Sequence, residues 1–162
     1  MMRISWKPWM GLLVLATALT ILQGCDEEED CSLNARPMMK CNLYQVNEES
    51  GLPEQVMLDE LTITAKGTDS VIVNRMTQVK ELSLPLCYGA DSTHLVLHYS
   101  NGSVDELVVY HANTPYFLSM ECGYQMKQQI ERVSYTRTVL DSVAITYNEA
   151  GIYERENLRL FY

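Results

Sequence analysis

The chain has 162 residues, of which 47% are hydrophobic and 20% are charged, and its formal net charge is −9. A chain of this length suffices for one domain that buries about two-thirds of its surface. The acidic charge repels the phosphates of nucleic acids and gives no attraction to anionic lipid headgroups, so nucleic acid is not an expected partner.

The N-terminal segment has the pattern of a bacterial lipoprotein signal. Arg3 and Lys7 form a short positive region, and the apolar run 10–22 leads to the sequence LQGC, which ends at Cys25. A helix over this run spans about 20 Å, too short for a hydrocarbon core of about 30 Å. We therefore expect residues 1–24 to be a cleaved lipoprotein signal peptide. Acyl chains on Cys25 then attach the protein to a membrane, with about 0.8 kcal/mol from each buried CH₂.

An unbroken acidic run, DEEED, occupies residues 26–30. Five consecutive carboxylates repel one another and favour a solvated tether. A calcium site is the alternative, but calcium needs oxygens that converge from a folded loop. We therefore expect a tether over residues 25–35 and a β-sandwich domain over residues 36–162.

The remaining sequence is a series of short segments in which apolar residues alternate with polar ones, as in strands. The predicted strands are 38–45, 56–65, 71–74, 81–86, 93–100, 103–111, 116–121, 139–147 and 156–162. Residues 125–132 are ambiguous, because Gln, Met, Lys and Glu also favour helix. About eight or nine strands without a long helix predict an all-β fold, an antiparallel, immunoglobulin-like β-sandwich.

The clearest turn signal is Asn101-Gly102, which lies between two segments rich in β-branched and aromatic residues. Asn-Gly favours a two-residue type I′ turn, which predicts that opposed residues sum to 203. Leu95 then faces Val108, and His98 faces Asp105. The resulting apolar face comprises Leu95, Leu97, Tyr99, Val104, Val108 and Tyr110, and Glu106 interrupts it.

Four cysteines follow Cys25: Cys31, Cys41, Cys87 and Cys122. An even number in an exported chain favours disulfides, but four cysteines permit three pairings and the spacing does not choose among them. No two lie two to four residues apart, so the spacing of a zinc site is missing. Two unpaired, buried cysteines remain the alternative.

Metal binding and catalysis find little support in the sequence. His94 and His98 share a strand face, but four strand residues span about 13 Å, so the two cannot hold one ion. Asp91, Ser92 and His94 lie on one turn, whereas a catalytic triad needs groups that converge. Neither a Gly-x-Ser-x-Gly nor a His-Glu-x-x-His motif occurs. We expect no catalytic residue, no metal and no cofactor.

Three serines share one local pattern, Asp followed by Ser and a β-branched residue: Ser70, Ser92 and Ser142. The pattern resembles the O-glycan acceptor sequence of exported Bacteroidota proteins. The alternative is ordinary turn-to-strand sequence, with Asp and Ser in the turn.

Several motifs together resemble a known family. They are Cys31, Arg36-Pro37, the LSLPL segment at 82–86, Cys-Gly-Tyr at 122–124 and the closing NLRLFY at 157–162. This layout resembles a family of small Bacteroidota envelope lipoproteins of unknown function. The resemblance implies an all-β fold, outer-membrane lipidation and no known catalytic residues.

The resemblance also implies that Cys31 pairs with Cys122. Such a bridge closes a loop of about 90 residues and contributes roughly 4 to 5 kcal/mol in the chain-entropy model. The pairing of Cys41 with Cys87 stays open. Acidic residues after the lipidated cysteine resemble a surface-export signal of Bacteroidota, although Asp at this position resembles an inner-membrane retention signal in enteric bacteria.

The function expected from these features is that of a non-catalytic outer-membrane lipoprotein, a binding or interaction module on the cell surface rather than on the periplasmic side. Its expected partners are the membrane, through the anchor on Cys25, and an outer-membrane protein or glycan. One alternative is an accessory subunit of an outer-membrane assembly or transport complex, since tethering raises the effective concentration near a barrel. A hydrolase of envelope glycans is the other alternative, and it requires a cleft with paired carboxylates.

Overall fold

The computed structural model describes residues 36–68, 70–120, 122–151 and 155–162. The predicted signal peptide, Cys25, Cys31 and the acidic tether therefore lie outside the described residues. Within these ranges the chain forms eleven strands and no helix, which confirms the all-β prediction. The same ranges contain no helix with the length and apolar character that a membrane crossing requires.

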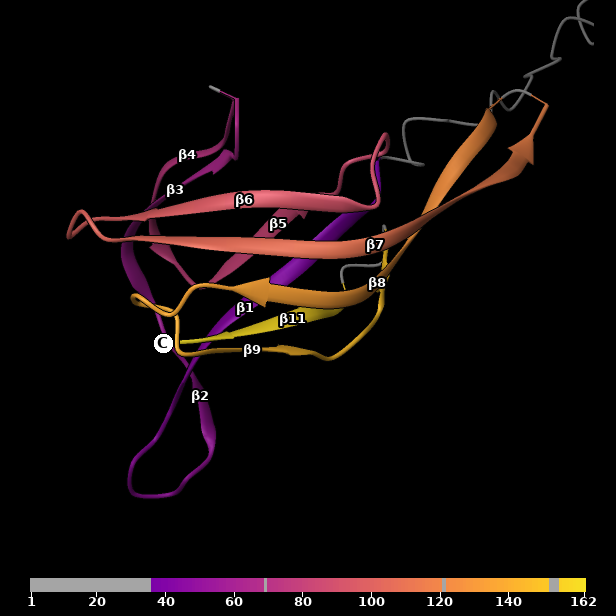
Figure 1. Ribbon diagram of the computed structural model, residues 1–162. Helices are drawn as coiled ribbons and strands as arrows, with labels where there is room; N and C mark the ends of the chain where they lie inside the picture. The colour runs from indigo at the N-terminus through magenta and orange to yellow at the C-terminus, as the bar shows by residue number, and fades with distance from the viewer. Residues whose placement is uncertain (1–35, 69, 121, 152–154) are drawn as a thin grey trace, which may run out of the picture. The chain divides into compact units, whose positions relative to one another are not determined.

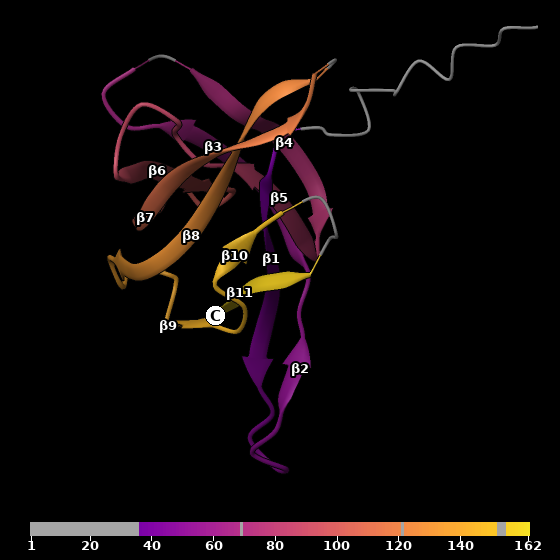
Figure 2. The ribbon, with the colours of Figure 1, turned by 90° about the vertical axis from the view of Figure 1, so that its right-hand side faces the viewer.

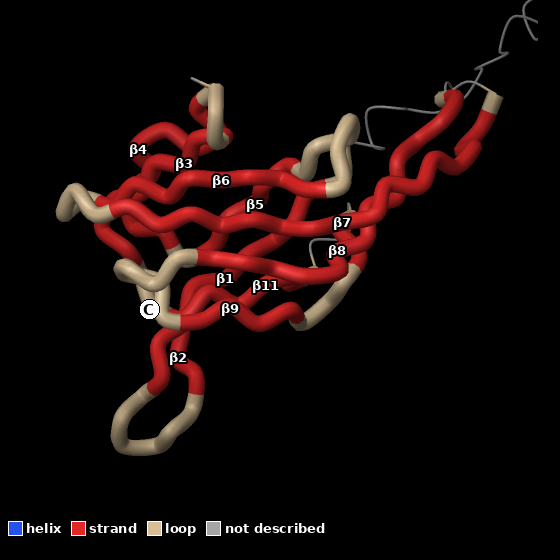
Figure 3. Tube along the Cα trace, viewed as in Figure 1, coloured by secondary structure: helices blue, strands red, loops and turns tan. Residues whose placement is uncertain are grey.

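The described strands form two sheets, which Figures 1 and 2 show from two sides and Figure 3 separates from the loops by colour. The larger sheet has the order β10 (Glu149–Ala150), β8 (Gly123–Tyr135), β7 (Val104–Ser119), β6 (Ser92–Tyr99), β3 (Leu58–Ala65) and β4 (Val71–Val79). The smaller sheet has the order β2 (Pro53–Gln55), β1 (Met38–Val46), β11 (Glu156–Phe161) and β9 (Ser142–Ile145), and β5 (Glu81–Pro85) also pairs with β1.

Two features of the topology differ from the prediction. The pairs are antiparallel except one, because β1 and β11, the first and last strands, run parallel with Leu43 opposite Leu160. The described strands number eleven rather than eight or nine. The additional ones include β2 and β10, which have three and two residues and are too short to show an alternating pattern.

The inner faces of the two sheets share one apolar core, which is consistent with the predicted β-sandwich. On β1, alternation buries Met39, Cys41 and Leu43, as the sequence predicts. Further buried members from both sheets are Leu61, Ile63, Leu84, Leu95, Leu97, Leu107, Val109, Leu158 and Leu160.

The strand β8 contains the segment 125–132 whose type the sequence left ambiguous. Its residues pair with β7 from Gly123, opposite Ser119, to Tyr135, opposite Leu107. Helix propensities span only a few tenths of a kcal/mol per residue for Gln, Met and Lys. The hydrogen bonds of a long strand pair outweigh that preference.

The β6–β7 hairpin corrects the predicted register. Its loop has three residues, Ser100, Asn101 and Gly102, since the Tyr99 N–H donates to the Ser103 carbonyl at 3.0 Å. Gly102 has φ of +81°, whereas Asn101 is not among the described residues with positive φ. A type I′ turn needs positive φ at both central residues, so the predicted turn is wrong. Leu97 lies opposite Asp105, and opposed residues sum to 202.

A shift of one residue moves every side chain of β7 to the other face of the sheet. Asp105, Leu107, Val109 and His111 therefore point inward and are buried. Glu106 lies on the outer face, where its side chain pairs with Lys66 at 2.6 Å. The apparent break in the predicted apolar face is thus a consequence of the wrong register.

Asp105 is fully buried, and its carboxylate accepts four hydrogen bonds. The donors are the Thr136 hydroxyl (2.6 Å) and the backbone N–H groups of Thr138 (2.7 Å), Val139 (2.8 Å) and Leu140 (2.9 Å). Burial alone would raise the pKa of Asp105, but these donors outweigh it and hold the pKa well below its usual range. The ionised side chain fixes the segment that leaves β8 for β9 in the smaller sheet.

Replacing Asp105 by Asn is expected to lower the free energy of unfolding by about 2–4 kcal/mol, because the amide NH₂ faces backbone N–H groups and one buried acceptor is lost. Urea denaturation followed by circular dichroism measures the change. The control is Asp141→Asn at an exposed ion pair with Arg137, where we expect less than about 0.5 kcal/mol. Equal effects at the two positions would contradict the assigned role of Asp105.

The hairpin loop gives a second prediction. A Cβ at Gly102 meets nothing within 4 Å, but the φ of +81° is strained for any L side chain. Gly102→Ala should therefore cost about 1 kcal/mol of stability. Gly89→Ala is the control, since Gly89 also has open space and its φ is not positive. If both alanine variants unfold at the same urea concentration, the three-residue loop is not the conformation in solution.

Candidate functional site

A buried polar cluster closes one end of the core. It consists of Thr93, His111, Asn113 and Gln128, and we call it the polar plug. His111 contacts Thr93 Oγ1 through Nε2 at 2.8 Å and Asn113 Oδ1 through Nδ1 at 3.1 Å. The Gln128 side chain donates to the same Asn113 oxygen at 2.9 Å. The plug joins β6, β7 and β8 where the apolar core ends.

The plug also holds the loop that connects β5 to β6. Asn113 Nδ2 donates to the backbone carbonyls of Cys87 (3.0 Å), Tyr88 (3.1 Å) and Ala90 (2.7 Å). The Cys87 N–H in turn donates to Thr93 Oγ1 at 2.7 Å. An open hollow of about 520 Å³ lies over this loop and the adjoining part of β7.

The hydrogen bonds assign the protonation state of His111. Because Asn113 Nδ2 donates to three carbonyls, its Oδ1 is the acceptor, and the proton on His111 lies at Nδ1. Nε2 then accepts from the Thr93 hydroxyl. His111 is 1% exposed, and burial lowers its pKa although the Asn113 contact and the charges of Asp91 and Glu131 act to raise it. The imidazole is therefore neutral.

The lowered pKa of His111 makes the fold sensitive to acid. Below the ordinary value of about 6.5 the unfolded chain binds a proton that the folded chain resists, so stability falls as the pH decreases, by at most about 1.4 kcal/mol per pH unit. We expect this loss between pH 7.5 and 5 in urea denaturation. His111→Gln should be less stable at pH 7.5 but should show a smaller decrease on acidification. An undiminished decrease would assign the acid sensitivity to other groups.

Beyond the polar plug, β7 and β8 continue as a two-stranded ribbon, which runs past the neighbouring strands in Figure 1. We call residues 114–120 and 122–127 the arm. The pairing of β6 with β7 ends at Tyr110, and β10 pairs with β8 only at Gln128 and Gln129. Among the described strands, the two strands of the arm therefore pair only with each other.

One face of the arm continues the inner face of the larger sheet. Phe117 lies opposite Tyr124, and Pro115 lies opposite Met126, in alternation with the plug pair of Asn113 and Gln128. The rings of Phe117 and Tyr124 pack edge to face at 5.5 Å between centroids, yet Phe117 is 52% and Tyr124 is 74% exposed. The apolar face thus extends beyond the part that the smaller sheet covers.

The end of the arm is apolar as well. Met120 is 85% exposed, and Tyr116 is exposed on the face opposite Phe117. From residue 114 to residue 126 the sequence contains one charged residue, Glu121. The sequence predicts a strand over 116–121 but not the exposure of its apolar side chains. The signal was present: Tyr116, Phe117 and Leu118 are consecutive and apolar, so both faces of that strand carry apolar side chains.

The first described residue, Arg36, lies at the foot of the arm. Its guanidinium donates to the Leu86 carbonyl at 2.6 Å and lies 4.7 Å from the centroid of the Tyr88 ring. The Tyr88 carbonyl accepts from Asn113, which immediately precedes the arm. The chain therefore enters the sandwich next to the base of this ribbon.

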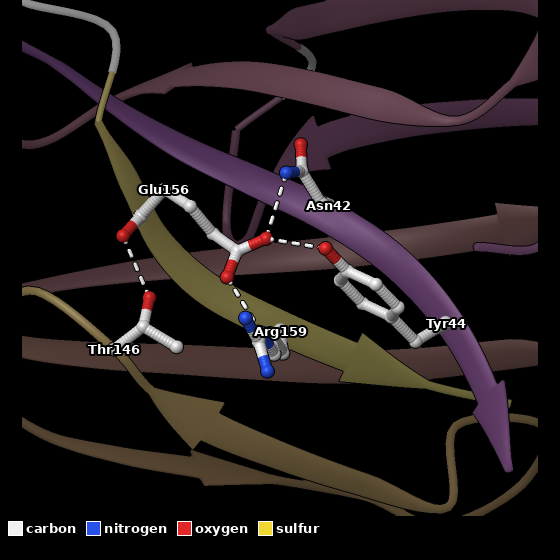
Figure 4. Close-up of polar contacts among 5 residues, drawn as sticks. All are labelled: Asn42, Tyr44, Thr146, Glu156 and Arg159. Atoms are coloured by element: carbon white, nitrogen blue, oxygen red, sulfur yellow. Dashed lines mark hydrogen bonds and ion pairs between the residues drawn. The ribbon is translucent and has the colours of Figure 1, made fainter. Parts of the chain in front are cut away.

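A second polar cluster lies on the outer face of the smaller sheet and is drawn in Figure 4. Glu156 Oε2 accepts from Asn42 Nδ2 and from the Tyr44 hydroxyl, both at 2.7 Å, and Oε1 accepts from Arg159 Nε at 2.6 Å. The Thr146 hydroxyl donates to the Glu156 carbonyl at 2.6 Å. These contacts clamp β1 to β11 and β11 to the chain that follows β9.

The electrostatics of this cluster favour an ionised Glu156. Burial acts to raise its pKa, but the hydrogen bonds from Tyr44, Arg159 and Asn42 outweigh that effect and lower it. The same contact raises the pKa of Tyr44. Glu156 therefore keeps its charge, and both carboxylate oxygens have donors from the neighbouring strands.

The structure also places the predicted cysteines. Cys41 is buried on β1 and Cys87 is exposed after β5, and both are free thiols, so the pairing that the sequence left open does not form. Cys41 lies opposite Leu82, and Cys87 is five residues farther along, about 16 Å in an extended chain, whereas a disulfide needs Cα atoms within about 7 Å. Cys122 is not a free thiol. Its predicted pairing with Cys31 stays a prediction, since Cys31 lies outside the described residues.

Two of the other candidate residues, Ser92 and His94, contact each other. His94 contacts Ser92 Oγ at 3.3 Å, and His98 contacts Thr64 Oγ1 at 3.1 Å. No group of three or more potential metal ligands gathers within the described part of the chain. The possible O-glycan acceptors are exposed at Ser70 and half-buried at Ser92 and Ser142, the first residues of β6 and β9. Their glycosylation stays a prediction.

Comparison with known proteins identifies a family. The model of a family of unknown function, DUF6452, matches residues 60–162. No curated protein and no solved structure matches the sequence. The match agrees with the expected family only in that its function is unknown, so the Bacteroidota origin and the lipoprotein character stay predictions.

Proposed function

We propose that this chain, which belongs to the DUF6452 family of unknown function, is a non-catalytic lipoprotein. Its β-sandwich is an interaction module at the outer membrane. Acyl chains on Cys25 anchor it, and the sandwich lies on the cell-surface side. The arm is its interaction surface.

The exposed apolar face of the arm is the observation that carries the proposal. Phe117 and Tyr124 are more than half exposed, although they continue a face that is buried elsewhere in the larger sheet. Contiguous exposed apolar surface of this kind marks interaction sites, and aromatic residues and Met are enriched at the centres of interfaces. The β-sandwich holds these side chains on a paired ribbon rather than on a loop.

The anchor is supported by the sequence before the sandwich. The run 10–22, followed by Cys25 and then by five carboxylates, has the order of an export signal, a lipidation site and a tether. Arg36 lies eleven positions after Cys25, so an extended tether reaches at most about 40 Å. The sandwich therefore stays close to the membrane that holds the acyl chains.

The hydrogen bonds of two carboxylates, Asp105 and Glu156, support a non-catalytic role. Asp105 accepts four hydrogen bonds from its own chain, and Glu156 accepts three. Both have lowered pKa values, which makes them poor proton donors near neutral pH. They lie on different elements, β7 and β11, and each bonds to neighbouring strands or loops.

If Cys25 is the lipid anchor, metabolic labelling with palmitate should mark the wild-type protein and not the Cys25→Ala variant. The reason is that the acyl chains are attached at Cys25. Cys31→Ala is the matched control and should keep the label. The wild-type protein should sediment with the outer-membrane fraction, and protease treatment of intact cells should degrade it. Label that survives Cys25→Ala, or wild-type protein that is absent from membranes, would refute the proposed anchor.

A further inference from the structure

We infer that the arm lies in the interface of the same bilayer that holds the acyl chains of Cys25, so that lipid rather than a second protein covers its apolar face. The inference rests on the proposed function and names the partner of the same surface.

The composition of the arm suits the lipid interface. Tyr116 and Tyr124 carry an apolar ring with a polar hydroxyl, the combination that is enriched at headgroup depth. Phe117 and Met120 add apolar side chains, and both are more than half exposed. The one cationic residue between 114 and 127 is Lys127 at the base of the arm, where it pairs with Glu149 at 3.0 Å. The end of the arm can therefore enter the interface without desolvating a cation.

The position of the tether brings the arm to the bilayer. Arg36 lies at the foot of the arm through its contacts with Leu86 and Tyr88. From Asn113 to Ser119 a strand extends about 20 Å, which is shorter than the tether's reach of about 40 Å. The predicted Cys31–Cys122 disulfide shortens the path from the lipid to the end of the arm to six residues, at most about 20 Å.

Charge also favours this orientation. The chain carries a net charge of −9, so the sandwich gains nothing from contact with anionic headgroups. Between residues 114 and 126 the sequence contains one acidic residue, Glu121. Among the described residues, the exposed large aromatic side chains are Tyr88, Tyr116, Phe117 and Tyr124, and three of these four lie on the arm.

Single tryptophans test the inference, because the two tryptophans of the chain, Trp6 and Trp9, lie in the predicted signal peptide. The full chain is expressed with its signal, and the purified acylated protein is inserted into phosphatidylcholine vesicles with or without brominated acyl chains. In vesicles, the tryptophan of the Phe117→Trp variant should emit at a shorter wavelength than tryptophan in water. Brominated lipid should reduce this emission about twofold.

Val104→Trp is the matched control. Val104 is 41% exposed and begins the strand that also contains Phe117, but it lies next to the hairpin loop at the opposite end. Its emission should resemble that of tryptophan in water and should be insensitive to brominated lipid. Tyr124→Trp, directly opposite Phe117, is a second reporter in case Phe117→Trp fails to fold.

The outcomes separate the inference from the proposed function. Acylated protein in which Phe117→Trp and Tyr124→Trp emit as in water, or in which Val104→Trp is quenched equally, overturns the inference. If brominated lipid does not quench the tryptophan in pure lipid vesicles, but the tryptophan of the arm is shielded from water in native membranes, the arm contacts a protein partner. This outcome also overturns the inference. Wild-type protein that lacks acyl mass or retains tryptophan fluorescence overturns the proposed anchor instead.

Discussion

The buried carboxylate of Asp105 is the contact on which the two-sheet arrangement depends. It lies on β7 in the larger sheet and binds three consecutive backbone N–H groups, those of residues 138–140, in the segment that leads to the smaller sheet. Those amides have lost their water, and a single ionised side chain satisfies all three of them. The crossover, and with it the placement of β9 beside β11, is thereby held by one charge.

The polar residues of β7 also explain why the arm begins where it does. Asp105 and His111 bracket the apolar residues Leu107 and Val109 on the inner face, so a shift of register would leave buried polar groups without partners. The plug around His111 and Asn113 closes the core with hydrogen bonds instead of apolar contacts. The apolar side chains that follow therefore lie outside the sandwich, where they serve contact with another body.

Alternation along the chain predicted most strands and the sandwich, because burial of one sheet face leaves a two-residue period that a single sequence shows directly. It could not predict the register of the β6–β7 hairpin, since Asn-Gly suits both a two-residue loop and a three-residue loop in which only Gly102 has positive φ. The role of Asp105 was hidden for a related reason: its donors begin more than thirty residues later. The anchor at Cys25 stays a prediction from the sequence, since Cys25 lies outside the described residues.

The free thiol of Cys41 carries a consequence for how this protein must mature. Burial raises the pKa of Cys41 far above its ordinary value, and Leu158 of the closing strand lies beside it. An oxidant can reach the Cys41 thiol only in the unfolded or opened chain, whereas the free thiol of Cys87 is exposed in the folded sandwich. Packing of β1 into the core therefore protects Cys41 from oxidation, and any step that opens the sandwich exposes the thiol again.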